Sequence, residues 1–204
     1  MISRPWIALI CLTPASLATG GELLFAPPES SLRVEVPKAG LMSFAGHEHT
    51  IEAGDFKGIL LIDSPNQSPM RIDLSVATER LEVTDAQLDA DTRGKVRKDM
   101  LSKQVLSSEA HPCIRFISNS ITVVSEGHWQ LEGKLSLAGS TSAVAFPVSI
   151  EWLSKDQLLA KGEVEVALKD FGIKPVSALG GLIRTGKTVR ISFHFVSQNP
   201  KETP

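Results

Sequence analysis

Aromatic residues are scarce in this 204-residue sequence, which has no tyrosine, three tryptophans and eight phenylalanines. An outer-membrane barrel would carry girdles of aromatic residues at both membrane interfaces, so that class is disfavoured. No run of roughly 20 apolar residues predicts a membrane-spanning helix, so stable membrane insertion is not expected. The 21 basic and 23 acidic residues nearly cancel, and this balance does not indicate a nucleic-acid partner.

Cysteine occurs only twice, and Cys11 lies in a segment typical of an export signal. Arg4 supplies the positive charge, residues 6–12 form an apolar core, and residues 16–18 provide the small residues of a cleavage site. We therefore expect residues 1–18 to be a signal peptide, cleaved near Ala18, and the mature protein to be periplasmic or secreted. A single remaining cysteine, Cys113, cannot form an internal disulfide, so the fold must depend on its hydrophobic core.

Apolar and polar residues alternate in segment after segment. In residues 129–137, Trp129, Leu131, Leu135 and Leu137 fall on one parity, and polar or charged residues fall on the other. Successive side chains of a strand point to opposite faces, so this segment predicts a strand with one buried and one solvated face. Further strand candidates occupy residues 32–36, 41–53, 56–63, 70–77, 114–124, 143–152, 158–168 and 187–196.

These segments predict an all-β fold. Short connections favour antiparallel neighbours, and about eight strands can close into an extended antiparallel barrel. A two-sheet sandwich is the alternative. Val96, Met100, Leu101 and Val105 have helical spacing and predict one crossover helix near residues 91–104. We expect residues 19–29 to be a flexible lead-in, residues 30–197 the barrel domain and residues 198–204 a disordered tail.

Several motifs share their order and spacing with a known family. A charged helical segment, Arg97-Lys98-Asp99-Met100-Leu101, precedes His111-Pro112-Cys113-Ile114-Arg115-Phe116-Ile117-Ser118. The hairpin over residues 131–141 follows, then Pro147-Val148, and finally the turn Asp170-Phe171-Gly172-Ile173. Over about residues 30–197 the sequence therefore resembles the YceI-like family of exported, lipocalin-like barrels associated with polyisoprenoid binding.

The resemblance implies a barrel with an apolar pore that binds an isoprenoid lipid or quinone, for carriage or storage in the periplasm. It implies neither catalysis nor a required cofactor. From alternation alone, a fully packed interior is the simpler expectation, whereas the resemblance favours a pore. The inward faces that would line this pore contribute Leu32, Val34, Ile72, Leu74, Phe116, Leu131, Leu135, Phe146, Val148, Val164, Val166, Ile191 and Phe193.

His47 and His49 carry the alternative hypothesis, a metal- or haem-linked redox protein. In an extended segment, residues two apart point to the same side, so both imidazoles could reach one metal ion. His111 or an acidic residue would then be the third ligand. Two histidines at this spacing are a weak metal signature, and hydrogen bonds at the pore rim, for example to a quinone head group, are the more ordinary interpretation.

No motif predicts catalysis. Asp170-Phe171-Gly172 lacks the glycine-rich loop and catalytic loop that accompany this tripeptide in a kinase, and no serine lies in a nucleophile elbow. The sequence leaves open whether the protein is a monomer or a homodimer.

Overall fold

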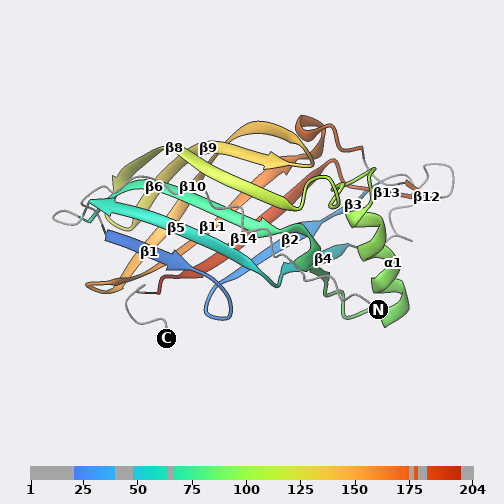
Figure 1. Ribbon diagram of the computed structural model, residues 1–204, viewed down its shortest axis with the longest axis horizontal. Coiled ribbons are helices and arrows are strands. Elements are labelled where there is room, and N and C mark those ends of the chain that lie inside the picture. Colours follow the sequence, from blue (N-terminus) through green and yellow to red (C-terminus); the bar gives the residue numbers. More distant parts are fainter. Residues whose placement is uncertain (1–20, 40–47, 64–66, 175–176, 179–182, 199–204) are drawn as a thin grey trace, which may run out of the picture.

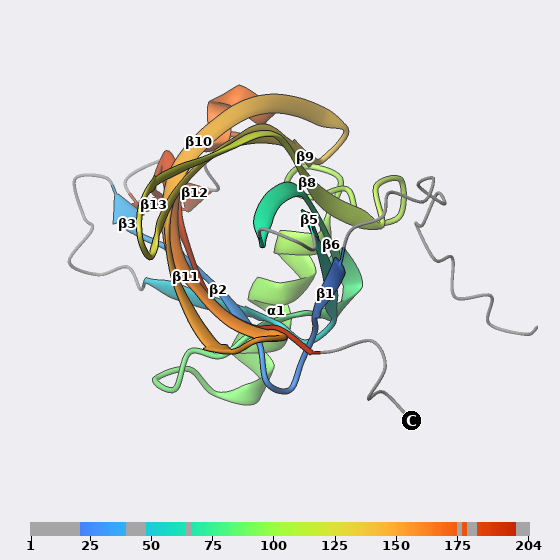
Figure 2. The same cartoon turned by 90° about the vertical axis from the view of Figure 1, so that its left-hand side faces the viewer.

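The alternating segments form one antiparallel sheet that curls around a central axis (Figure 1, Figure 2). The computed structural model describes residues 21–39, 48–63, 67–174, 177–178 and 183–198. The sheet consists of eleven strands in the order β1-β5-β6-β8-β9-β10-β11-β14-β2-β4-β7. Their bounds are β1 (Gly21–Phe25), β2 (Ser31–Val36), β4 (His49–Ala53), β5 (Phe56–Asp63), β6 (Ser68–Ala77), β7 (Leu81–Val83), β8 (Cys113–Ser125), β9 (His128–Leu137), β10 (Ser140–Ser154), β11 (Gln157–Ala167) and β14 (Thr188–Val196). Three short strands, β3 (Lys38–Ala39), β12 (Ser177–Ala178) and β13 (Ile183–Thr185), form a separate small sheet.

The curled sheet is closed by one bridge rather than by a full ladder. Its edge strand β1 pairs with the chain just beyond β14, where Leu24 and Gln198 exchange two backbone hydrogen bonds of 3.2 and 2.7 Å. The expected all-β antiparallel barrel with one α-helix is confirmed, but its eleven strands exceed the expected eight. The strands that the sequence did not predict are the two at the edges of the sheet, β1 and β7, which have only five and three residues.

Two expectations about the ends of the barrel are wrong. Residues 21–25 of the expected flexible lead-in form β1, in which Leu23 and Phe25 are each 4% exposed. Gln198, expected in a disordered tail, belongs to the closing bridge. Glycines at the start of β1 and prolines after it concealed the strand, because both residue types are typical of loops. Residues 1–18 and 199–204 lie outside the described residues.

The helix α1 (Ala90–Leu101) lies across one end of the barrel (Figure 2). Asp89 caps its first turn, because the carboxylate accepts hydrogen bonds from the Thr92 amide at 2.8 Å and the Thr92 hydroxyl at 3.0 Å. These bonds lower the pKa of Asp89. The helix ends before the expected residue 104, because Ser102 is extended and its hydroxyl donates to the Asp99 carbonyl at 2.6 Å.

Two one-turn 3-10 helices, η2 (Thr78–Arg80) and η3 (Leu168–Phe171), connect strands. Among the residues described above, no helix has the length and apolar character that a membrane crossing requires.

Phenylalanine rings lie against inward-facing glycines on neighbouring strands. A Cβ atom added to Gly133 of β9 would be 2.6 Å from Cε2 of Phe116 on β8. One added to Gly162 of β11 would collide with Cζ of Phe193, which pairs with Gly162 from β14. The two glycines therefore provide the space in which these rings lie close to the sheet.

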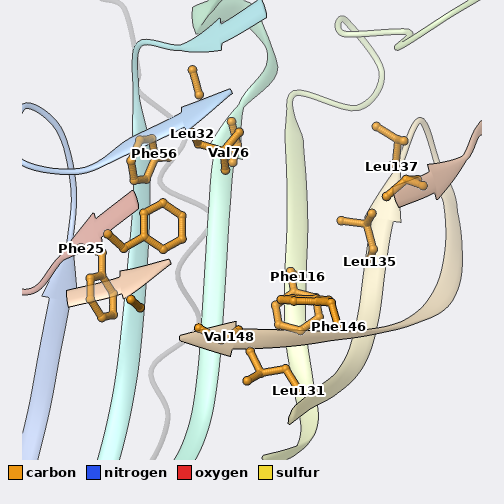
Figure 3. Close-up of a cluster of buried hydrophobic side chains, with 14 of the residues drawn as sticks. Phe25, Leu32, Phe56, Val76, Phe116, Leu131, Leu135, Leu137, Phe146 and Val148 are labelled. Carbon is orange, nitrogen blue, oxygen red and sulfur yellow. The ribbon is translucent and has the colours of Figure 1, made fainter. Parts of the chain in front are cut away.

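The rings continue from strand to strand around the interior. Phe146 links the two ring–glycine contacts, at centroid distances of 5.4 Å to Phe116 and 6.0 Å to Phe193. Phe193 stacks on Phe195 at 4.9 Å, and Phe195 in turn contacts Phe25 and Phe56. Figure 3 shows Phe25, Phe56, Phe116 and Phe146 among the aliphatic side chains of this core.

We predict that Gly133→Ala destabilises the protein by about 1–3 kcal/mol, the usual cost of overpacking a core. The added methyl group would meet the Phe116 ring and also the Ile117 carbonyl oxygen, which belongs to the backbone and cannot rotate away. The measurement is urea unfolding followed by circular dichroism.

Gly94→Ala is the matched control. Nothing lies within 4 Å of a Cβ added to this helical residue, so the change should stabilise the protein by about 0.5–1 kcal/mol. Equal effects of the two substitutions would contradict the packing described for Phe116.

Candidate functional site

A cavity of about 140 Å³ lies inside the barrel, and we call it the central cavity. Its lining is apolar and comes from every strand of the main sheet except β4. All thirteen residues expected on inward faces lie in this lining: Leu32, Val34, Ile72, Leu74, Phe116, Leu131, Leu135, Phe146, Val148, Val164, Val166, Ile191 and Phe193. Figure 3 labels six of them, which come from β2, β8, β9 and β10 and converge on the same interior.

Some lining residues could not be assigned from the sequence. Phe25 lies in β1, where no strand was expected, and Gly58 and Leu60 lie in β5, which has apolar residues on both parities. Leu60 is 1% exposed, whereas its neighbours Ile59 and Leu61 are only half-buried on the outer face. The alternation of burial along β5 therefore follows from the curl of the sheet and not from its composition.

A second cavity of about 230 Å³ lies beneath α1, and we call it the helix-end cavity. Val96 and Met100 of α1 line it, together with Val105 and Leu106 from the turn that follows. It shares the wall residues Val34, Leu81, Ile114, Leu135, Val166 and Ile191 with the central cavity, so the two cavities adjoin. Each is smaller than the roughly 300 Å³ at which small-molecule sites begin. A ligand with a long tail therefore needs both.

Two arginines fasten α1 over the helix-end cavity. The Arg97 guanidinium donates to the carbonyls of Leu81 at 2.9 Å and Glu79 at 2.5 Å, and it lies 3.2 Å from the Glu82 carboxylate. Arg93 donates to the Asp85 carbonyl, beyond β7, at 3.3 Å, and to the Leu88 carbonyl, just before the helix, at 2.5 Å. No residue of α1 is fully buried. The helix therefore covers the cavity through polar contacts more than through apolar burial.

His49 is one of the few polar residues that line the helix-end cavity. Its Nδ1 atom lies 2.6 Å from the Asp85 carboxylate, whose side chain is 1% exposed. His47, the other expected metal ligand, lies outside the described residues. His111, the suggested third ligand, packs against Gly139, so that a Cβ added there would be 2.5 Å from its Nε2 atom. Within the described ranges, no group of three or more His, Cys, Asp or Glu side chains is placed to hold a metal ion.

A wider groove of about 770 Å³ lies on the outside of the barrel, over β2, β10, β11 and β14. Exposed charged residues line it, including Arg33, Lys161 and Glu163. Arg33 already pairs with Glu52 at 2.8 Å, and Glu163 with Arg190 at 2.9 Å. The two apolar cavities inside the barrel are therefore the stronger candidate for a binding site.

An antiparallel barrel of this kind, capped by a helix and hollow along its axis, has the architecture of a lipocalin-like protein. A model of the YceI-like domain matches residues 25–197. The chain belongs to the YceI-like family, and the resemblance seen in its motifs is confirmed.

Solved structures share the fold at low sequence identity. BcnA of Burkholderia cenocepacia has a TM-score of 0.65 and 13% identity, over 83% of this chain and 96% of that one. The YceI protein of Campylobacter jejuni has a TM-score of 0.60 and 13% identity, over 74% and 85%. A polyisoprenoid binding domain from Saccharophagus degradans, implicated in plant cell wall breakdown, has a TM-score of 0.59 and 11% identity, over 87% and 98%. A comparison with curated proteins found no match.

We predict that Arg97→Ala loosens α1 without unfolding the barrel. Loss of the bonds to Leu81 and Glu79 should raise amide hydrogen exchange in residues 90–101 roughly fivefold, as expected for about one net hydrogen bond. Lys98→Ala, at an exposed position of the same helix, is the control and should leave the exchange rate unchanged. Identical exchange in the two variants would show that other contacts hold the helix.

Proposed function

We propose that this protein binds an apolar lipid with an isoprenoid tail inside its barrel. The observation that carries the proposal is the pair of adjoining apolar cavities along the barrel axis. The polyisoprenoid binding domain from Saccharophagus degradans, which shares the fold, supports this ligand class. The thirteen inward residues named above would contact the tail, and binding requires no catalytic residue or cofactor.

The chemistry of the lining suits such a tail. An isoprenoid chain has no hydrogen-bonding groups, so it enters an apolar cavity without leaving a polar group unsatisfied. Removal of its surface from water contributes roughly 25 cal/mol per Å². The branched side chains of Val34, Val164 and Ile191 are only half-buried although they face the interior, so they offer contact area that the protein itself leaves unused.

Quinones and polyprenyl carrier lipids are the proposed ligands, because both join an isoprenoid tail to a small polar head. The export signal expected over residues 1–18 supports carriage or storage of such a lipid in the periplasm. A redox function built on His47 and His49 is less favoured, because the contact of His49 within the described residues is with a buried carboxylate.

The direct test is mass spectrometry of the native protein. The full chain is expressed in a bacterial host, purified without detergent, and extracted with organic solvent. We expect an isoprenoid lipid at a substantial fraction of one per protein. Protein that is empty on isolation, and that also takes up no added C20 isoprenoid, would refute the proposal.

We predict that Val144→Phe blocks lipid binding while the barrel stays folded. Val144 lines the central cavity, and the larger ring would occupy space that the ligand needs. We expect at least a tenfold loss of affinity for an isoprenoid alcohol, measured by isothermal titration calorimetry.

Ala145→Phe is the control on the same strand, because Ala145 is exposed on the outer face. It should bind the lipid like the unmodified protein. If Val144→Phe also binds normally, the ligand does not occupy the central cavity.

A further inference from the structure

A histidine–aspartate pair lies at the polar side of the helix-end cavity. His49 begins β4 and shares its parity with the buried residues Ile51 and Ala53. Asp85 follows β7, which pairs with β4 in register. One carboxylate oxygen of Asp85 lies 2.6 Å from His49 Nδ1, and the other accepts the Thr50 amide at 2.6 Å. Each oxygen of this almost completely buried carboxylate therefore has a hydrogen-bond partner.

This contact determines which ring nitrogen is left for a ligand. An ionised carboxylate only accepts hydrogen bonds, so Nδ1 of His49 carries the proton that it donates to Asp85. The other nitrogen, Nε2, accepts a hydrogen bond when the ring is neutral and donates one when the ring is protonated. Nε2 of the neutral ring can therefore accept a hydrogen bond from the hydroxyl group of an alcohol, and Nε2 of the protonated ring can donate one to the carbonyl oxygen of a quinone.

The surrounding charges restrict the head group further. The lining of the helix-end cavity includes Asp99 and Lys174 in addition to His49. With the buried Asp85 behind His49, two carboxylates oppose one lysine when His49 is neutral, and they oppose two positive charges when it is protonated. A diphosphate would meet this nearly balanced set of charges without the cluster of cations that such an anion requires. A neutral oxygen atom needs only the single hydrogen bond that Nε2 offers.

We propose that His49, oriented by Asp85, hydrogen-bonds the neutral oxygen head group of the isoprenoid lipid. The head group lies in the helix-end cavity, and the tail runs into the central cavity. This inference rests on the proposed function and adds to it a preference for alcohols and quinones over prenyl diphosphates.

Four probes with the same branched C20 skeleton test the preference: phytane, phytol, phylloquinone and phytyl diphosphate. Phytane has no head group, phytol has a hydroxyl, phylloquinone has a quinone, and phytyl diphosphate has a diphosphate. We expect phytol and phylloquinone to bind about three- to tenfold more tightly than phytane, the gain of one hydrogen bond. Phytyl diphosphate should gain nothing over phytane. If only one of phytol and phylloquinone binds more tightly than phytane, the result identifies whether a hydroxyl or a carbonyl oxygen is recognised.

His49→Phe keeps a ring in the wall but removes both nitrogens. It should lower the affinity for phytol and phylloquinone to that for phytane, and leave phytane binding unchanged. His128→Phe, at an exposed histidine on the outer face, is the control and should change none of the four affinities.

A preference that survives His49→Phe, or tightest binding of the diphosphate, would overturn the inference while leaving lipid binding intact. Failure of the unmodified protein to bind any of the four, phytane included, would instead refute the proposed function and the inference with it.

His49→Phe leaves the buried Asp85 with the Thr50 amide but without the imidazole, so a second measurement avoids dependence on the folding of this variant. The ¹⁵N resonance of His49 Nε2 in the unmodified protein should shift on addition of phytol and not of phytane. The double variant His49→Phe/Asp85→Asn removes the buried charge as well, and it should bind phytol and phytane equally. An Nε2 resonance that responds alike to both probes would overturn the inference.

Discussion

The register between neighbouring strands is the constraint on which this barrel depends. A slip of one residue would turn an entire apolar face outward. A slip of two residues would keep the face, but it would bring Phe193 opposite Ala160 or Val164 in place of Gly162. Either side chain would occupy the space of the ring. The contacts of phenylalanine with glycine therefore specify one alignment where alternation alone allows several.

Core and cavity are built from the same set of residues. Leu60 and Leu158 are almost fully buried, whereas Val34, Val144, Val164 and Ile191 face the same interior and are half-buried. An empty cavity costs stability, because its lining has lost packing partners. A bound tail restores those contacts, so occupation of the cavity and folding of the barrel are thermodynamically linked.

Much of the barrel could be predicted because its strands are amphipathic. Alternation assigned thirteen residues to inward faces, and all of them line the central cavity. It failed for β5, where both faces are apolar, and for β1, which lies between glycines and prolines. Asp85 was missed because it lies 36 residues from His49 in sequence. Only the pairing of β4 with β7 brings the two together, and neither strand shows in its own sequence which partner it takes.

The bridge between Leu24 and Gln198 joins segments from near the beginning and near the end of the described chain. Contacts of such large sequence separation form slowly, because closing so long a loop costs conformational entropy. During synthesis the first strand emerges long before its final neighbour, and until then its edge remains open to unwanted pairing. Complete closure of the barrel therefore has to wait until Gln198 has left the ribosome, and a chain released or truncated before that residue would keep one edge of β1 unpaired.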